Sequence, residues 1–360
     1  MKISICIPTF NRAEVVYKNV IKCLEHREID LEVVVSDNCS EDNTEKILGQ
    51  IEDNRFKYVK NEYNNGFENL VSVLTYAEGD YLLLTSDEDQ VIFSSLKEVI
   101  PVLENENPAI LKGGASLFGK SYIVHRDGNY EKGFEAIKAY GAGCAYMSGY
   151  IFNSKIMKKV LNGTSGKKLN RRFGYAFCFI NLAIEMLEFG KLSYRKEILT
   201  DQFVNAKRDT TALFDCGKIA YSPEKTLESI EEKIDALART SLNEEQKFYM
   251  CEHCLNRQIV ECHISEYKST YNNVILEDIR KSGEKEIYNY YIENRKKLEK
   301  EDIFKEIENS INTCIGYIDD IHMFNMKYEK LMRKYNQITK EFLNKKYEIL
   351  NQFKKELKLG

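Results

Sequence analysis

The sequence predicts an α/β fold, a mostly parallel sheet flanked by helices, followed by an all-α C-terminal region. In the first part of the 360-residue chain, short apolar runs alternate with apolar residues at helical spacing. Strand-like segments disappear after about residue 222, and all four prolines lie at or before Pro223. We therefore expect two domains, residues 1–222 and residues 223–360.

Each element of the first domain follows from its local pattern. The run LEVVVS (31–36) is rich in β-branched residues, which is typical of a strand buried on both faces of a parallel sheet. Val16, Val20 and Leu24 recur at helical spacing after the first strand. Alternation of this kind predicts right-handed crossovers between parallel strands. The expected elements are strand 3–7, helix 13–26, strand 31–36, a helix from about residue 42, strand 56–60, helix 67–78 and strand 81–85.

The second domain predicts helices throughout. Ser222 followed by Pro223 is a favourable helix start. Residues 321–360 contain ten lysines or arginines against four glutamates, a net charge of +6. This segment also has apolar residues at heptad-like spacing: Phe324, Tyr328, Leu331, Tyr335, Ile338 and Phe342. The pattern is consistent with helix packing, within the chain or in a homo-oligomer, and with a basic helix lying on anionic lipid.

Composition excludes several classes of protein. The net charge of −4 argues against a general nucleic-acid binder, which is normally basic. No apolar run approaches the ~20 residues needed to span a bilayer, and MKISICIPTF predicts a first strand rather than a signal peptide. The ten cysteines are scattered, which is typical of a reducing compartment. We expect a cytoplasmic protein, with membrane association on the cytoplasmic face left open.

Polar segments follow three of the expected strands. They are PTFNR (8–12), SDNCSEDNT (36–44) and SDED (86–89). Each alone has an ordinary explanation as a helix cap or a solvated turn. Parallel strands bring their carboxyl ends to one edge of the sheet, where ligands bind at the point of strand-order reversal. Together the three segments therefore predict one ligand site.

These segments, the spacing from Asn65 to Asn69 and the run AEGDYLLL (77–84) resemble the family-2 nucleotide-sugar glycosyltransferases. The resemblance is dense over residues 3 to about 92, thinner over 149–157 and 189–199, and ends near residue 205. It implies a GT-A, Rossmann-like fold and an inverting transfer of sugar from a nucleotide-diphosphate donor, a UDP-sugar. It also implies Mn²⁺ or Mg²⁺ as cofactor. The acceptor would be a hydroxyl of a surface glycan, of a lipid-linked glycan, or of a surface protein such as flagellin.

The acidic segment after the fourth strand predicts the metal site. A leaving diphosphate concentrates negative charge, and two carboxylates offer the oxygen ligands that Mg²⁺ or Mn²⁺ prefers. The resemblance makes Asp89 the direct ligand and places Asp87 at the ribose or in the same coordination shell. Glu88 occupies the variable position between them. By the same resemblance the donor is expected to contact Pro8, Thr9, Asn11, Arg12, Asp37, Asn65, Asn69, Ser86, Asp87 and Glu88.

The expected general base is missing from its usual place. Family members carry an acidic pair about eleven residues before the glycine that corresponds to Gly190, where this chain has residues 178–181, CFIN. Glu185 is the nearest candidate base, and Asp201 is a further one; either could instead be an ordinary surface carboxylate. The alternative function is therefore a nucleotide-sugar-binding module with a transferase fold and no activity.

Three further segments carry interpretations of their own. Residues 146–150 and Arg171 to Phe173 are expected to border the acceptor side. Cys251, Cys254, Cys262 and His263 could indicate zinc. However, the second pair is adjacent and the run predicts one helix, so structural cysteines on a helical face are the better interpretation.

We expect that deleting residues 321–360 disturbs assembly or solubility, while residues 1–320 still hydrolyse the donor. An aromatic seam buries more apolar area than a screened surface charge can match. Light scattering and liposome flotation of both lengths of chain test this. Unchanged mass with lost flotation would show that the segment binds membrane instead.

Overall fold

The computed structural model describes residues 1–141, 143–144, 146–161, 177–204 and 232–250. Two compact units divide the chain: Met1–Ala212 with Glu231–Phe248, and Leu213–Ile230 with Tyr249–Gly360. Nearly all of the described residues belong to the first unit, and the elements below form it. The expected boundary at residue 222 lies outside the described residues and stays a prediction.

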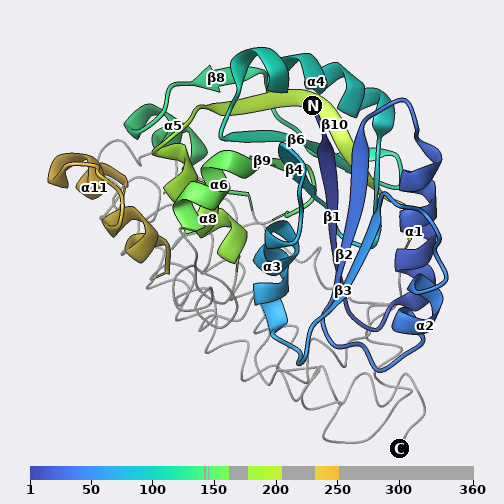
Figure 1. The fold of residues 1–360 in the computed structure, drawn as a ribbon. Coiled ribbons are helices and arrows are strands. Elements are labelled where there is room, and N and C mark those ends of the chain that lie inside the picture. Colours follow the sequence, from blue (N-terminus) through green and yellow to red (C-terminus); the bar gives the residue numbers. More distant parts are fainter. Residues whose placement is uncertain (142, 145, 162–176, 205–231, 251–360) are drawn as a thin grey trace, which may run out of the picture. The chain divides into compact units, whose positions relative to one another are not determined.

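One mixed sheet carries the fold (Figure 1). Its strand order is β3-β2-β1-β4-β9-β6-β10-β5, with β7 beside β6 and β8 beside β10. The described strands are β1 (Ile3–Thr9), β2 (Leu31–Asp37), β3 (Phe56–Lys60), β4 (Tyr81–Leu84), β5 (Asp89–Val91), β6 (Ile110–Leu117), β7 (Lys120–Ile123), β8 (Gly128–Tyr130), β9 (Tyr150–Asn153) and β10 (Leu192–Gln202). The described helices include α1 (Ala13–Glu25), α2 (Thr44–Leu48), the 3₁₀ turn η1 (Gly66–Glu68), α3 (Asn69–Thr75), α4 (Phe93–Glu106), α5 (Phe134–Tyr140), α6 (Ser154–Leu161), α8 (Cys178–Leu187) and α11 (Glu244–Met250).

The strand order reverses at β1. The chain passes from β1 outward to β2 and β3 and then returns to the other side of β1 as β4. All three of these pairings are parallel, so β1, β2 and β4 end at the same edge of the sheet. That edge is the switch point at which open α/β sheets bind ligands.

Both faces of these strands are buried by helices. Ile5, Val33 and Leu83 belong to one core cluster, which also contains side chains of α1 and α4. Cys6 and Val34 face the other way and are fully buried on the side where α3 packs on β1 and β2. Figure 1 shows α1 and α3 on opposite sides of these strands. Burial on two faces explains why the strands are continuous apolar runs.

The structure confirms the expected α/β class in the part of the chain that it describes, but the sheet is mixed rather than mostly parallel. Strand 56–60 and the start of the first helix agree with the sequence pattern. Two helices are shorter than expected, since α2 ends before Gly49 and the segment 67–78 divides into η1 and α3. The antiparallel strands β5, β7, β8 and β9 were not expected, because strand direction depends on distant pairing partners rather than on local pattern.

Glu32 fixes the opposite, amino-terminal edge of β1 and β2. Its carboxylate accepts hydrogen bonds from Ser4 Oγ at 2.6 Å, Lys2 Nζ at 2.7 Å and the Glu78 amide at 2.6 Å. Burial raises the pKa of Glu32, but the bonds from Lys2, Ser4 and Glu78 outweigh it and hold the pKa below its ordinary value of 4.5. The charged form is therefore the one that stabilises the fold.

We expect Glu32→Gln to lower the free energy of unfolding by about 2 kcal/mol at neutral pH, because a charge-assisted bond is lost. Because the pKa of Glu32 is lower in the folded than in the unfolded protein, its charged carboxylate stabilises the fold at pH values above the unfolded-state pKa. This stabilisation is lost as the pH falls through the folded-state pKa. The difference from wild type should therefore shrink in acid. Urea denaturation at both pH values tests this, with the exposed Glu78→Gln as control. A pH-independent difference would contradict the assignment.

Candidate functional site

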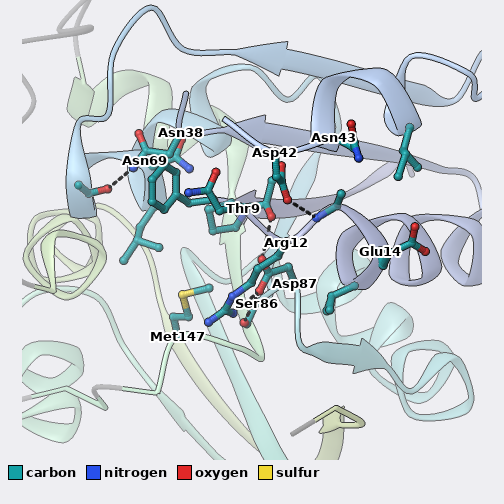
Figure 2. A pocket seen from close by; sticks show the side chains of 18 residues that line it. Thr9, Arg12, Glu14, Asn38, Asp42, Asn43, Asn69, Ser86, Asp87 and Met147 are labelled. Carbon is teal, nitrogen blue, oxygen red and sulfur yellow. Dashed lines mark hydrogen bonds and ion pairs between the residues drawn. The ribbon is translucent and has the colours of Figure 1, made fainter. Parts of the chain in front are cut away.

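The segments that follow β1, β2 and β4 line one pocket of about 690 Å³ (Figure 2). Among the residues expected to contact the donor, Pro8, Thr9, Asn11, Arg12, Asn69, Ser86 and Asp87 line it. The lining does not include Asp37, Asn65, Glu88, Asp89 or Glu185. The structure thus brings the three strand ends together, and the contacts of each residue with a ligand stay predictions.

The end of β1 is bonded to the acidic turn after β4. Thr9 Oγ1 donates to Asp87 Oδ2 at 2.8 Å, and Arg12 Nη1 donates to Asp87 Oδ1 at 2.9 Å. Arg12 Nη1 also lies 2.7 Å from Glu88 Oε1. The side chain of Arg12 is 32% exposed and that of Asp87 only 5%, so the cation reaches from a buried acid toward the pocket. Figure 2 shows Arg12, Asp87, Ser86 and Met147 gathered at one end of the pocket.

The loops after β1 and β2 are bonded to each other. The Asn11 amide donates to Ser40 Oγ at 2.8 Å, and Asn11 Oδ1 accepts from the Glu41 amide at 2.8 Å. Asn11 has a φ of 51°, a left-handed conformation that asparagine adopts more readily than most residues. Asp42 Oδ2 accepts from the Ala13 amide at 3.1 Å, which satisfies an amide in the first turn of α1.

Asp37 lies at the end of β2 and is fully buried. Its Oδ1 accepts from the Ser40 amide at 2.9 Å and from the Ser40 hydroxyl, and its Oδ2 accepts from the Tyr58 hydroxyl at 2.6 Å. The next residue, Asn38, lines the pocket. The expected contact between Asp37 and a base or ribose stays a prediction.

An asparagine network shapes the other end of the pocket. Asn38 Oδ1 accepts from the Asn65 amide at 2.9 Å, and Asn38 Nδ2 donates to Gly66 O at 3.2 Å. Asn69 Nδ2 donates to Ser36 O at 2.9 Å. Gly66 has a φ of 61°, which glycine adopts without steric cost. The network positions Asn38 and Asn69, whereas Asn65 takes part through its backbone.

Asp89 begins β5 and is held by the segment 146–148. The Tyr146 hydroxyl lies 2.9 Å from each carboxylate oxygen, and the Ser148 hydroxyl donates to Oδ2. Ser148 Oγ also accepts from the Ser86 amide at 2.9 Å. Met147, between the two hydroxyl residues, lines the pocket. The sequence indicated this segment as a border of the site but carried no signal for its bonds to Asp89.

The electrostatics of Asp89 fit a bound cation. The pKa of Asp89 is raised to about 6. Burial is the largest cause, the charges of Glu88 and Asp87 add to it, and the hydrogen bonds from Ser148 and Tyr146 partly oppose it. Within the described residues Asp89 forms no ion pair, so its negative charge has no partner there. No described group of three histidine, cysteine or acidic residues could hold a metal. An ion held by Asp87 and Asp89 would therefore take its other oxygen ligands from phosphate or water.

Glu88 is engaged on both oxygens. Oε1 lies 2.7 Å from Arg12 Nη1, and Oε2 accepts from Gln202 Nε2 at 2.9 Å. The variable residue of the acidic triplet thus ties the turn to β10 and supports Arg12. Its direct contact with a nucleotide stays a prediction.

Neither candidate base lines the pocket. Glu185 Oε1 accepts from Arg239 Nε at 2.7 Å, and Glu185 is buried within α8. Asp201 Oδ1 accepts from Ser116 Oγ and from the Gly119 amide at 2.9 Å. The assignment of a base to Glu185 or Asp201 stays a prediction.

Glu68 is a buried carboxylate that the sequence pattern does not mark as a site residue. It is 2% exposed, and both of its oxygens lack a hydrogen-bond partner among the described residues. Burial raises the pKa of Glu68, and its charge acts on the Cys178 thiol at the start of α8. Its neighbours Gly66 and Asn69 line the pocket. A glutamate in the first turn of a helix is ordinary in sequence, which is why the pattern carried no signal.

Several expectations lie outside the described residues. They concern the helices from residue 251 onward, the basic segment 321–360, and Arg171, Arg172, Phe173, Cys251, Cys254, Cys262 and His263. Of the helices in the described part, none combines the length and apolar character needed to cross a bilayer.

The fold is that of an α/β protein whose pocket lies at the carboxyl ends of parallel strands, beside buried acids. A sequence profile of glycosyl transferase family 2 matches residues 4–122. That region contains β1 to β4 and the acidic turn. The expected resemblance to this family is confirmed.

Curated relatives are similar to part of the chain. The "GalNAc(5)-diNAcBac-PP-undecaprenol beta-1,3-glucosyltransferase" of Campylobacter jejuni is 30% identical over 138 residues, 37% of this chain and 42% of that protein. The "UDP-Glc:alpha-D-GlcNAc-diphosphoundecaprenol beta-1,3-glucosyltransferase WfgD" of Escherichia coli is 25% identical over 123 residues, 34% of this chain and 49% of that protein. The chain thus matches less than half the length of these relatives.

Solved structures share the fold. TarS 1-349 of S. aureus in complex with UDP has a TM-score of 0.53 at 15% identity, covering 94% of this chain and 92% of that chain. The same fragment in complex with UDP-GlcNAc gives the same TM-score and identity. At this identity the likeness shows the fold alone, and it confirms the expected GT-A architecture.

We expect Asp37→Asn to lower the free energy of unfolding by about 1–3 kcal/mol, because an amide nitrogen cannot accept the bonds of Ser40 or Tyr58. Tyr58→Phe removes one of these bonds and should cost about 1 kcal/mol. Urea denaturation of both variants measures the effect. Wild-type stability combined with lost UDP binding in Asp37→Asn would instead show that Asp37 serves the nucleotide and not the fold.

Proposed function

We propose that the protein is a metal-dependent, inverting glycosyltransferase. It would move one sugar from a UDP-sugar to a hydroxyl of a lipid-linked surface glycan. The observation that carries this proposal is the pocket where the strand order reverses. Arg12 and Asp87 line it, Asp89 follows Asp87 in the same turn, and all three residues lie within the family match. The name of the Escherichia coli relative specifies UDP-Glc, which supports a uridine donor.

Charge determines how the donor would lie. Arg12 reaches the pocket with its guanidinium already paired to Asp87 and Glu88, and guanidinium groups bind phosphate oxygens well. The diphosphate would therefore lie at the end of the pocket with Arg12, Ser86 and Met147. The nucleoside would lie toward Asn38 and Asn69 at the other end.

Asp87 and Asp89 are the residues that would hold Mn²⁺ or Mg²⁺. When bound, the ion would offset the negative charge that develops on the leaving diphosphate. The chain's own part is to keep the carboxylates in place. Thr9 and Arg12 hold Asp87, while Tyr146 and Ser148 hold Asp89.

The relatives favour a lipid-linked acceptor. The names of the Campylobacter jejuni and Escherichia coli proteins both specify glycans on undecaprenol diphosphate. They give no support to a protein hydroxyl such as that of flagellin. A lipid-linked acceptor would place the reaction at the cytoplasmic face of a membrane, and residues 223–360 would make the contact with it.

The alternative is a module that binds a nucleotide sugar without transferring it. The absence of a carboxylate at residues 178–181 favours this alternative. Within the described residues, Glu185, Asp201 and Glu68 are the candidate bases. Hydrolysis of UDP-sugars by the full chain would separate the two functions, since a competent site loses some sugar to water.

We expect calorimetry to show UDP binding about tenfold tighter or more with Mn²⁺ than with EDTA. Asp89→Asn should remove this enhancement and abolish turnover, because it removes the charge while keeping the shape. Glu88→Gln is the matched control and should have a mild effect. Equal affinity with and without metal in the wild-type protein would refute the metal site, and equal losses in the two variants would mean that the ligands are misassigned.

A further inference from the structure

Lys112 carries a buried charge that the site described above does not use. It lies in β6 and is fully buried. Its Nζ donates to Ser148 O at 2.6 Å and to Tyr146 O at 3.2 Å, and it lies 4.4 Å from the centroid of the Tyr150 ring. In the part of the chain that the structure describes, no carboxylate forms an ion pair with it.

A buried ammonium is costly unless its hydrogen bonds are made. Burial lowers the pKa of Lys112 to about 8, against the opposing charges of Cys144 and Asp89. An apolar side chain of similar volume would fill this place in the core without that cost. The ammonium therefore stabilises the structure through the hydrogen bonds it donates to two carbonyl groups. These carbonyls belong to a segment outside helices and strands, so no neighbouring strand or helical turn supplies their donors.

The residues that receive these bonds are the ones that hold Asp89. Tyr146 and Ser148 each give a carbonyl oxygen to Lys112 and a hydroxyl to the Asp89 carboxylate. A single backbone segment thus has a buried cation on one side and the expected metal ligand on the other. Any movement of the carbonyl groups also moves the hydroxyls, because they belong to the same residues.

The ends of this segment are fixed by other bonds. The Gly149 amide donates to Leu84 O at 3.1 Å, and the Gly113 amide donates to Gly149 O at 3.1 Å. At the other end, the Cys144 amide donates to the Tyr150 hydroxyl at 3.0 Å. Between these ties, the backbone carbonyls of residues 146 and 148 depend on the buried ammonium.

We propose that Lys112 is a positioning residue of the donor site: its ammonium fixes segment 146–148, and through the hydroxyls of Tyr146 and Ser148 it holds the carboxylate of Asp89. The inference rests on the proposed function only in taking Asp89 as a metal ligand. Lys112 itself does not line the pocket.

Lys112→Met removes the ammonium and keeps most of the side-chain length. We expect amide exchange at Gly149 and Ser86, measured in the full chain without metal or nucleotide, to become about tenfold faster or more, as a charge-assisted bond is lost. Calorimetry with Mn²⁺ in the presence of UDP should show an affinity about tenfold lower. Unchanged exchange, or faster exchange with unchanged Mn²⁺ affinity, would overturn the proposal.

Lys57→Met is the matched control. Lys57 is also a strand lysine whose Nζ donates to a backbone carbonyl, that of Tyr76, at 2.9 Å, but it lies in β3 and not at this segment. Neither amide exchange at Gly149 nor Mn²⁺ affinity should change in this variant. A loss equal to that of Lys112→Met would show a general effect of removing a lysine and would overturn the proposal.

Tyr146→Phe gives a test that does not depend on how well Lys112→Met folds. It removes a hydroxyl bond to Asp89 but keeps the carbonyl bond to Lys112, so Mn²⁺ affinity should fall while exchange at Gly149 stays as in wild type. Faster exchange there would mean that Asp89 holds the segment rather than Lys112, which overturns the proposal. Wild-type protein that binds neither Mn²⁺ nor UDP would defeat the proposed function alone, because the exchange results do not need either ligand.

Discussion

The bonds from Thr9 and Arg12 to Asp87 are the interaction on which the candidate site depends. They join the end of β1 to the turn after β4, two segments that are 75 or more residues apart in sequence. Asp87 is 4% exposed, and a buried carboxylate is tolerated only when it is paired and hydrogen-bonded. The same contacts direct Arg12 toward the pocket. The ion pair that stabilises the buried Asp87 therefore also places a cation where a phosphate would bind.

Asp89 is held in a different way, and the contrast explains the geometry of the site. Asp87 forms an ion pair with Arg12, the residue just before α1. Asp89 instead accepts hydrogen bonds from the hydroxyls of Tyr146 and Ser148, in the segment just before β9. Asp87, which is paired with Arg12, lines the pocket. Asp89 has no charged partner among the described residues, and burial raises its pKa. A divalent cation would complete the charge balance at the second acid without displacing an ion pair.

The alternation of strands and helices and the meeting of the three strand ends could be predicted from the sequence, because both follow from local pattern and from general rules of α/β topology. The contacts of Asp89 could not, since Tyr146 and Ser148 belong to a loop far from Asp89 in sequence, and the strand that follows this loop, β9, pairs antiparallel with β4. Asp37 shows a further limit: the motif marks it as a ligand contact, yet its oxygens are bonded to Ser40 and Tyr58. A sequence pattern indicates which residues gather at a site, but not which of them support the others.

A crystal structure of the full chain with Mn²⁺ and UDP tests the central claim most directly. If the ends of β1, β2 and β4 form a donor site, the diphosphate lies beside Arg12 in the pocket they line, and Mn²⁺ lies about 2.0–2.6 Å from an oxygen of Asp89. UDP bound in another part of the molecule, or Mn²⁺ bound without Asp89, would contradict it.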